Sequence, residues 1–158
     1  MLQWEPGQPQ NNSVKFPDKT PIVRYKHALR SRYGETDRMG YVYYGRYLEY
    51  FEVARTEMIR SYGLSYREME ESGIMLPVIH AELEYKAPIL YDEEMTITVS
   101  IFDMPSVRLQ TFYEVTTAAS DNVHVFGEVT LCFMNSDTRK PRRAPETFLN
   151  GIQQQLKT

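Results

Sequence analysis

The chain has 158 residues, which suits a single domain, and its aromatic content of 12 Tyr and 7 Phe is high. A formal net charge of −3 argues against a global basic field that would recruit nucleic acid or an acidic membrane surface. The single cysteine, Cys132, has no intrachain disulfide partner and fits a reducing compartment. Because neither a secretory signal nor an apolar window of about 20 residues is visible, we expect a cytoplasmic protein without membrane insertion.

The first third of the chain divides into an arm, a strand and a loop. Residues 1–20 hold three prolines and little periodicity, so we expect a flexible N-terminal arm there and a single domain over residues 21–158. Residues 22–33 alternate between apolar and basic side chains, as a strand does. Residues 34–45 are punctuated by glycine and form a loop.

The middle of the chain carries helix signals. Residues 46–62 place apolar side chains at steps of three and four, and Gly63 follows as a stop. The apolar stripe is wide, which suggests a helix covered on more than one side, and the charged residues on it need internal partners or a narrow outlet. A short helix is expected over residues 65–72, with Ser65 and Glu68 spaced as a capping box.

The remainder reads as an antiparallel run of strands. Alternation predicts strands near residues 79–86, 94–101, 107–115 and 123–133, separated by turn-rich loops such as Ser120-Asp121-Asn122, and a short helix near 145–156. One early strand, a long helix and this run predict an α+β fold, with an antiparallel sheet of about five strands wrapped around the helix. The sheet edges need protection, and pairing two subunits through the sheet would provide it.

Residues 35–47, Glu-Thr-Asp-Arg-Met-Gly-Tyr-Val-Tyr-Tyr-Gly-Arg-Tyr, are the most informative stretch. They place Asp37 in a turn-like segment just before the long helix, with Gly45 at the helix entry. A carboxylate beside free helix N-terminal amides combines a base or nucleophile with an anion site. An Asp in this position also commonly serves as a cap or turn residue, and the local pattern leaves both interpretations open.

Residues in and beyond this stretch form a longer pattern. It comprises Tyr33, Glu35-Thr36-Asp37, Met39-Gly40, Val42-Tyr43, Tyr47, the helical residues 50–57 and Tyr85-Lys86-Ala87-Pro88. This pattern resembles the 4-hydroxybenzoyl-CoA thioesterase-like family of hotdog-fold acyl-CoA thioesterases, including the branch encoded beside the bacterial Tol–Pal envelope system. The likeness spans roughly residues 22–145. Tyr44 departs from the Tol–Pal branch, which usually has His there, while the hydroxybenzoyl branch has an aromatic residue.

The resemblance implies a hotdog fold, a homodimer or homotetramer, and hydrolysis of an acyl-CoA to a free acid and coenzyme A. Asp37 would attack the thioester carbonyl or activate water, two routes that the sequence does not separate. No metal or prosthetic group is implied, and coenzyme A enters only as part of substrate and product. The implied supporting residues are the amides around Tyr44, Gly45 and Arg46 as oxyanion donors, and Val42, Tyr43 and Tyr47 as an aromatic acyl pocket or as helix-entry packing.

Several further residues have competing interpretations. Glu35, two residues from Asp37, could form a carboxylate pair but is expected to be solvated. The three histidines have no metal-ligand spacing, so His27 is expected to be semi-buried, and His80 and His124 to lie on strand surfaces. The dense basic run Arg139, Lys140, Arg142 and Arg143 could clamp the phosphates of coenzyme A or form a solvated tail, and Arg24, Lys26, Arg30 and Arg32 compete for the clamp.

Two other functions fit the same predicted fold. An acyl carrier protein could replace coenzyme A as the acyl donor, docking as a protein partner through the basic run. A non-catalytic acyl-binding or interaction module is also possible, because fold alone does not fix function.

Overall fold

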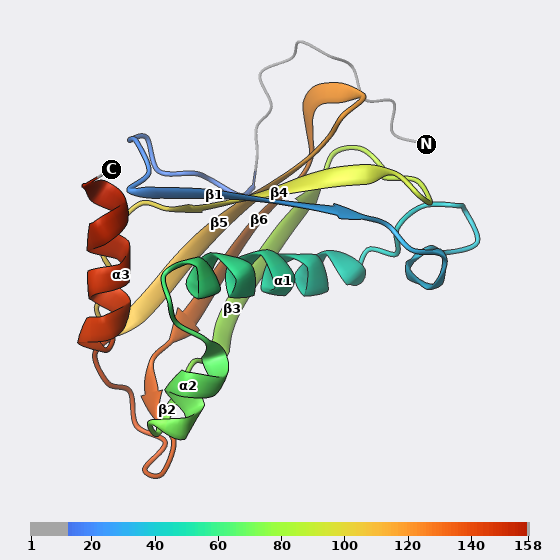
Figure 1. The fold of residues 1–158 in the computed structure, drawn as a ribbon. Helices are drawn as coiled ribbons and strands as arrows, with labels where there is room; N and C mark the ends of the chain where they lie inside the picture. Colours follow the sequence, from blue (N-terminus) through green and yellow to red (C-terminus); the bar gives the residue numbers. More distant parts are fainter. Residues whose placement is uncertain (1–12, 158) are drawn as a thin grey trace.

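A curved five-stranded sheet forms the body of the molecule in a computed structural model, which describes residues 13–157 (Figure 1). Its strands are β1 (Val23–Arg30), β3 (Val78–Tyr85), β4 (Glu94–Ile101), β5 (Arg108–Thr117) and β6 (Ser120–Cys132). They are antiparallel in the order β1-β4-β5-β6-β3, so β1 and β3 are the edges. The predicted α+β class with five strands is therefore confirmed.

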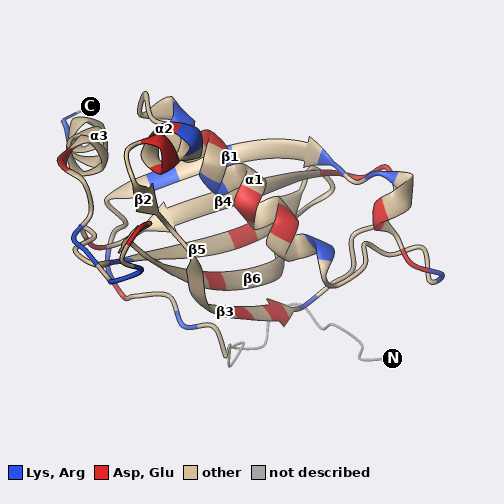
Figure 2. Cartoon of the chain, turned by 90° about the horizontal axis from the view of Figure 1, so that it is seen from below, with Lys and Arg blue, Asp and Glu red and all other residues tan. Residues whose placement is uncertain are grey.

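The long helix α1 (Arg46–Ser61) lies across one face of this sheet (Figures 1 and 2). The ring of Phe51 stacks on that of Tyr113 from β5, with centroids 4.2 Å apart. Gly127 on β6 permits this close approach, because a Cβ there would lie 2.3 Å from the Phe51 ring. The helix ends just before Gly63, whose φ of 81° favours glycine, as the sequence predicted.

One charged residue on the apolar stripe of α1, Arg55, finds internal partners, whereas Glu49, Glu52 and Arg60 are exposed. Arg55 is buried, and its guanidinium donates to the hydroxyls of Tyr66 at 2.8 Å and Tyr113 at 3.0 Å. The Tyr113 hydroxyl is in turn 2.7 Å from the Thr111 hydroxyl. A hydrogen-bonded network of this kind offsets the cost of burying a charge.

Two shorter helices, α2 (Tyr66–Glu71) and α3 (Glu146–Leu156), lie on the side of the molecule where α1 ends (Figure 1). In α2 the Ser65 hydroxyl accepts from the Glu68 amide at 3.1 Å, as the predicted cap requires. The terminal helix α3 packs Phe148 against Phe133. A small sheet of β2 (Ile74–Met75) and β7 (Met134–Asn135) escaped prediction, because strands of two residues show no alternation.

One predicted loop is wrong. Residues 120–122 begin β6, and Thr117 pairs with Ser120, so the β5–β6 turn lies at residues 118–119. Turn-forming residue types at the start of β6 misled the prediction, whereas the actual turn consists of two alanines.

Part of the N-terminal segment packs on the face of the sheet away from α1. The Phe16 ring contacts the rings of Phe102, Phe112 and Phe126, with centroids 6.1, 5.1 and 5.9 Å away. The amides of Ser13 and Val14 donate to the Glu84 carboxylate at 2.7 and 3.4 Å. Residues 13–16 therefore contact the sheet, whereas residues 1–12 of the expected flexible arm lie outside the described residues.

The edge strand β3 leaves its apolar face open in one chain. Ile79 and Tyr85 are about half exposed, although the alternation over residues 79–86 predicts a covered face, and Val78 is half exposed as well. Leu48 and Val53 of α1 are also exposed, so the expected cover on a second side of the helix is not provided within one chain. Between residues 13 and 157, no helix is long and apolar enough to cross a membrane.

Candidate active site

The loop between β1 and α1 is a tight hairpin that presents Asp37. A short 3₁₀ turn, η1 (Tyr33–Glu35), leads into a bridge between Thr36 and Val42, and the Asp37 amide donates to the Tyr41 carbonyl at 2.8 Å. Residues 38–40 form its tip, where Gly40 has a φ of 79°. Three-residue hairpin loops need a residue with positive φ, which explains the glycine after Met39.

The carboxylate of Asp37 has one engaged and one available oxygen. Its Oδ1 accepts from the Met39 amide at 2.8 Å and from the Tyr41 amide at 3.4 Å, so it stabilises the turn. Its Oδ2 has no hydrogen bond within the described part of the chain. The turn-residue interpretation of Asp37 therefore holds for one oxygen and leaves the other for chemistry.

Glu35 is buried, so the expectation of a solvated side chain is wrong. Its carboxylate accepts from the Arg32 amide at 2.8 Å and the Arg32 guanidinium at 3.3 Å. Burial acts to raise the pKa of Glu35, but the hydrogen bonds from the Arg32 amide and guanidinium outweigh it and hold the pKa below its ordinary value. Its carbonyl also accepts from the Tyr43 amide at 2.8 Å, so Glu35 holds both ends of the hairpin.

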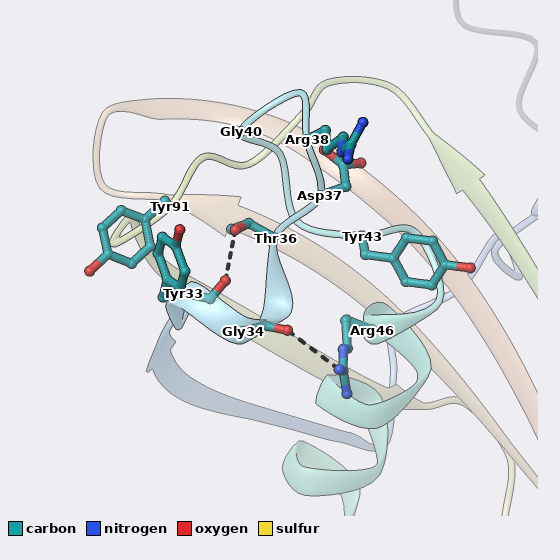
Figure 3. Close-up of a pocket in the computed structure, with 9 residues that line it drawn as sticks. All are labelled: Tyr33, Gly34, Thr36, Asp37, Arg38, Gly40, Tyr43, Arg46 and Tyr91. Carbon is teal, nitrogen blue, oxygen red and sulfur yellow. Dashed lines mark hydrogen bonds between the residues drawn. The ribbon is translucent and has the colours of Figure 1, made fainter.

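A broad hollow, here called the polar hollow, opens on one side of Asp37 (Figure 3). Its volume is about 790 Å³. Arg38 and Arg46 give it two cationic groups, and Tyr33 and Tyr91 form an edge-to-face aromatic pair at its rim. The lining residues are Tyr33, Gly34, Thr36, Asp37, Arg38, Gly40, Tyr43, Arg46 and Tyr91.

A second and smaller hollow, here called the apolar hollow, shares Asp37 with the first. Its volume is about 270 Å³, and aromatic and aliphatic side chains dominate its walls. Of the three residues expected to form an acyl pocket or to pack the helix entry, Val42 and Tyr47 line this hollow, whereas Tyr43 lines the polar hollow. The lining residues are Asp37, Met39, Tyr41, Val42, Tyr44, Tyr47, Tyr85, Lys86, Ala87 and Pro88.

The backbone amides at the entry of α1 divide into engaged and free donors. The Arg46 amide donates to the Tyr43 carbonyl at 2.9 Å, so it is already used within the turn. The amides of Tyr44 and Gly45 have no hydrogen bond to any residue between 13 and 157. A Cβ at Gly45 would lie 2.9 Å from the Tyr43 ring, which explains the glycine at this position.

The predicted phosphate clamp lies far from Asp37 within one chain. Residues 139–143 follow β7 at one end of the molecule, whereas the Asp37 hairpin forms the opposite end (Figures 1 and 2). The cations that line the polar hollow are Arg38 and Arg46. Arg46 also pairs with Glu49 at 3.0 Å. Sequence reasoning missed both guanidinium groups, although their positions beside Asp37 and at the helix entry were a usable signal.

A possible cation-binding cluster also escaped the sequence. Glu82 on β3 pairs in register with Glu128 on β6, and His80 Nε2 is 3.3 Å from a Glu128 carboxylate oxygen. One donor atom from each residue lies within 4.8 Å of the others, a set that could hold a divalent cation. None of the three lines either hollow, and Glu128 follows Gly127, so it points away from α1.

The sequence and the fold are similar to those of known proteins. A model of the thioesterase-like superfamily matches residues 31–152, so the chain belongs to that superfamily. The putative acyl-CoA thioesterase YneP of Bacillus subtilis is 34% identical over 96 residues, which cover 61% of this chain and 70% of the relative. The acyl-CoA thioester hydrolase YbgC of Escherichia coli is 27% identical over 82% of this chain and 96% of its own.

A solved structure gives the same result. The DHNA-CoA thioesterase of Staphylococcus aureus superposes with a TM-score of 0.72 at 33% identity. The match covers 76% of this chain and 80% of that one. The hotdog fold implied by the sequence resemblance is therefore confirmed.

Proposed function

We propose that this protein is an acyl-CoA thioesterase that hydrolyses the thioester to a free carboxylic acid and coenzyme A. The observation that carries the proposal is the position of Asp37. Asp37 lines both the apolar hollow and the polar hollow. The free backbone amides of Tyr44 and Gly45 lie at the entry of α1 beside it. The names of the relatives favour coenzyme A over an acyl carrier protein as the acyl donor. The aromatic residue at Tyr44 favours the 4-hydroxybenzoyl-CoA-like branch over the Tol–Pal branch.

We assign the two parts of the substrate to the two hollows. The acyl group suits the apolar hollow, and the phosphates of coenzyme A suit the polar hollow with Arg38 and Arg46. The thioester carbonyl then lies at Asp37. In this arrangement the free Oδ2 of Asp37 either attacks the carbonyl carbon to give a mixed anhydride or takes a proton from an attacking water.

The remaining steps follow from the charge that develops. Attack at the carbonyl creates an oxyanion, which the free amides of Tyr44 and Gly45 would stabilise as hydrogen-bond donors. Collapse of the tetrahedral intermediate breaks the C–S bond and releases coenzyme A as a thiolate. The thiolate takes the proton that Asp37 removed from water in the general-base route, and a proton from solvent in the mixed-anhydride route. In the mixed-anhydride route, water then hydrolyses the anhydride and regenerates Asp37. No metal or prosthetic group takes part in this proposed reaction, and we propose that it occurs in the cytoplasm.

The test is release of free thiol from acetyl-, butyryl-, hexanoyl-, decanoyl- and benzoyl-CoA by wild type and Asp37→Asn. Asparagine keeps an oxygen that can accept from the Met39 amide, so the turn persists while the negative charge is lost. We expect kcat to fall by about 100-fold or more, the scale of losing a general base.

The matched control is Asp137→Asn, which makes the same change in an exposed loop at the other end of the molecule. It should leave kcat within about twofold of wild type. Near-wild-type turnover by Asp37→Asn would remove Asp37 from the mechanism. Acyl-CoA binding without thiol release by wild type would instead support a non-catalytic module.

A further inference from the structure

Tyr85 contributes an ordered hydroxyl beside the helix entry. Its hydroxyl donates to the carbonyl of Tyr44 at 3.0 Å, which joins the end of the edge strand β3 to the turn before α1. The ring is packed edge to face against Tyr44 and tilted against Tyr47, with centroids 6.4 and 5.7 Å away. These contacts restrict the ring, so the hydroxyl stays within hydrogen-bond distance of the Tyr44 carbonyl.

This hydrogen bond acts on one of the two free amides. The carbonyl of Tyr44 and the N–H of Gly45 belong to the same planar peptide unit, and the described chain contains no cis peptide bond. In a trans peptide the C=O and N–H point in opposite directions. A donor that holds the Tyr44 carbonyl therefore also fixes the direction of the Gly45 N–H. Polarising that carbonyl also strengthens the N–H as a donor.

The neighbouring peptide unit is held in a similar way. The carbonyl of Tyr43 accepts from the Arg46 amide at 2.9 Å, and this fixes the direction of the Tyr44 N–H. One free amide is thus oriented by a bond within the turn, and the other by a side chain 41 residues away in sequence. Rotation of the Tyr44–Gly45 peptide would turn the second donor away, so its orientation depends on Tyr85.

We propose that Tyr85 is a positioning residue for the oxyanion site, whose hydroxyl holds the Gly45 amide in the orientation that receives the developing negative charge. This inference rests on the proposed thioesterase function. It adds a residue from the sheet edge to a site otherwise built from the β1–α1 loop. Burial, and after it the neighbouring Tyr44 phenol, raise the pKa of Tyr85, so the hydroxyl keeps its proton as the donor at neutral pH.

The first test is the variant Tyr85→Phe, assayed on whichever of the five acyl-CoA substrates wild type hydrolyses best. The ring stays in the apolar hollow and only the hydroxyl is lost. We expect kcat to fall about tenfold, part of the 10²–10³-fold cost of losing a whole oxyanion donor, while KM stays within about twofold. A kcat within about twofold of wild type, or a rise in KM alone, would overturn the proposal.

The matched control is Tyr62→Phe. The Tyr62 hydroxyl is buried and has no hydrogen-bond partner within residues 13–157, and Tyr62 lines neither hollow. The control variant removes the same hydroxyl from a tyrosine outside the site, so kcat and KM should both stay at wild-type values. A tenfold fall in kcat for this control would show that hydroxyl loss anywhere disturbs turnover, which would overturn the assignment to Tyr85.

A second measurement is independent of catalysis. The ¹⁵N and ¹H resonances of the Gly45 amide report on the hydrogen bond to the preceding carbonyl. They should shift in Tyr85→Phe and stay in place in Tyr62→Phe. An unmoved Gly45 resonance would overturn the positioning role even in a fully active enzyme. A shifted resonance in a protein that releases no thiol would instead locate the failure in the proposed function.

Discussion

The two ends of this molecule both carry arginines, yet only one end surrounds them with the parts of a reaction site. At the hairpin end, Arg38 and Arg46 share a hollow with Asp37 and lie next to two free backbone amides. At the other end, residues 139–143 are more strongly basic but lie far from a candidate catalytic group in the same chain (Figure 2). A dense run of basic residues in the sequence is therefore a weaker guide to a phosphate site than an arginine that lies beside a reactive group.

A second copy of the chain would change this comparison. Strand β3 runs from the basic end, where Pro77 accepts from the Cys132 amide, to the hairpin end, where Tyr85 bonds Tyr44. Antiparallel pairing of two such edges would place the basic end of one copy beside the hairpin end of the other. The half-exposed apolar residues of β3 favour such pairing, and we propose that the protein is at least a dimer.

Among changes outside the Asp37 loop, the largest expected effect comes from disrupting the edge strand β3. A lysine at Ile79 puts a charge on the open face of β3, so Ile79→Lys should convert the assembly to a monomer and lower activity at least about tenfold. Light scattering at micromolar concentration measures the mass, and thiol release measures activity. Leu156→Lys, a like change at an exposed position of α3, should alter neither. A wild-type protein that is an active monomer would contradict the proposed pairing.

The next effect separates the two basic ends. We expect Arg38→Ala with Arg46→Ala to raise KM for acyl-CoA about tenfold and leave kcat largely intact, because phosphate contacts are alike in ground and transition states. The rise should shrink as salt increases and vanish for a short thioester without the nucleotide. The counterpart is Arg142→Ala with Arg143→Ala, for which we expect an unchanged KM at low salt. If KM rises there instead, the basic end of a paired copy reaches the nucleotide.

A smaller effect tests how much the buried carboxylate of Glu35 stabilises the folded protein. Glu35→Gln should lower the free energy of unfolding by about 1 kcal/mol at neutral pH, since charge-assisted hydrogen bonds to Arg32 are weakened. The pKa of Glu35 is depressed in the folded protein, so its contribution is present above the ordinary value of about 4.3 and is lost as pH falls through the folded pKa. Urea unfolding of both proteins at neutral and acidic pH should therefore converge at the acidic end.

The control for this variant is Glu71→Gln. Glu71 pairs with Arg67 at 3.0 Å on the exposed surface of α2, where a salt bridge contributes little. We expect a loss of roughly 0.3 kcal/mol with weak pH dependence. A Glu35 variant that matches this control would show that the buried carboxylate does not stabilise the hairpin.

The last prediction is that removal of metal ions has no effect on activity. The reaction proposed for Asp37 uses no metal, so prolonged treatment with EDTA should leave thiol release unchanged. Loss of activity that a divalent cation restores would contradict this and direct attention to His80, Glu82 and Glu128. The variant His80→Ala would then show whether that cluster holds the cation.

Short-range patterns in the sequence were enough to define the local elements. Steps of three and four over residues 46–62 predict α1 almost to the residue, and Ser65 predicts the cap of α2. The glycines at 40 and 45 and the resemblance to a known family identify the Asp37 hairpin as the candidate site. These features depend on residues a few positions apart, so the chain order already contains them.

Contacts between distant residues required the tertiary structure. The Phe16 ring contacts Phe102, Phe112 and Phe126, which lie 86 to 110 residues further along the chain. The bond from Tyr85 to Tyr44 joins residues 41 apart, and strand register pairs Glu82 with Glu128. Periodicity gives each element its faces but not its neighbours. The apolar hollow, which brings Tyr85 of β3 beside Asp37 and Tyr47, therefore required the packing of β3 against the loop and α1.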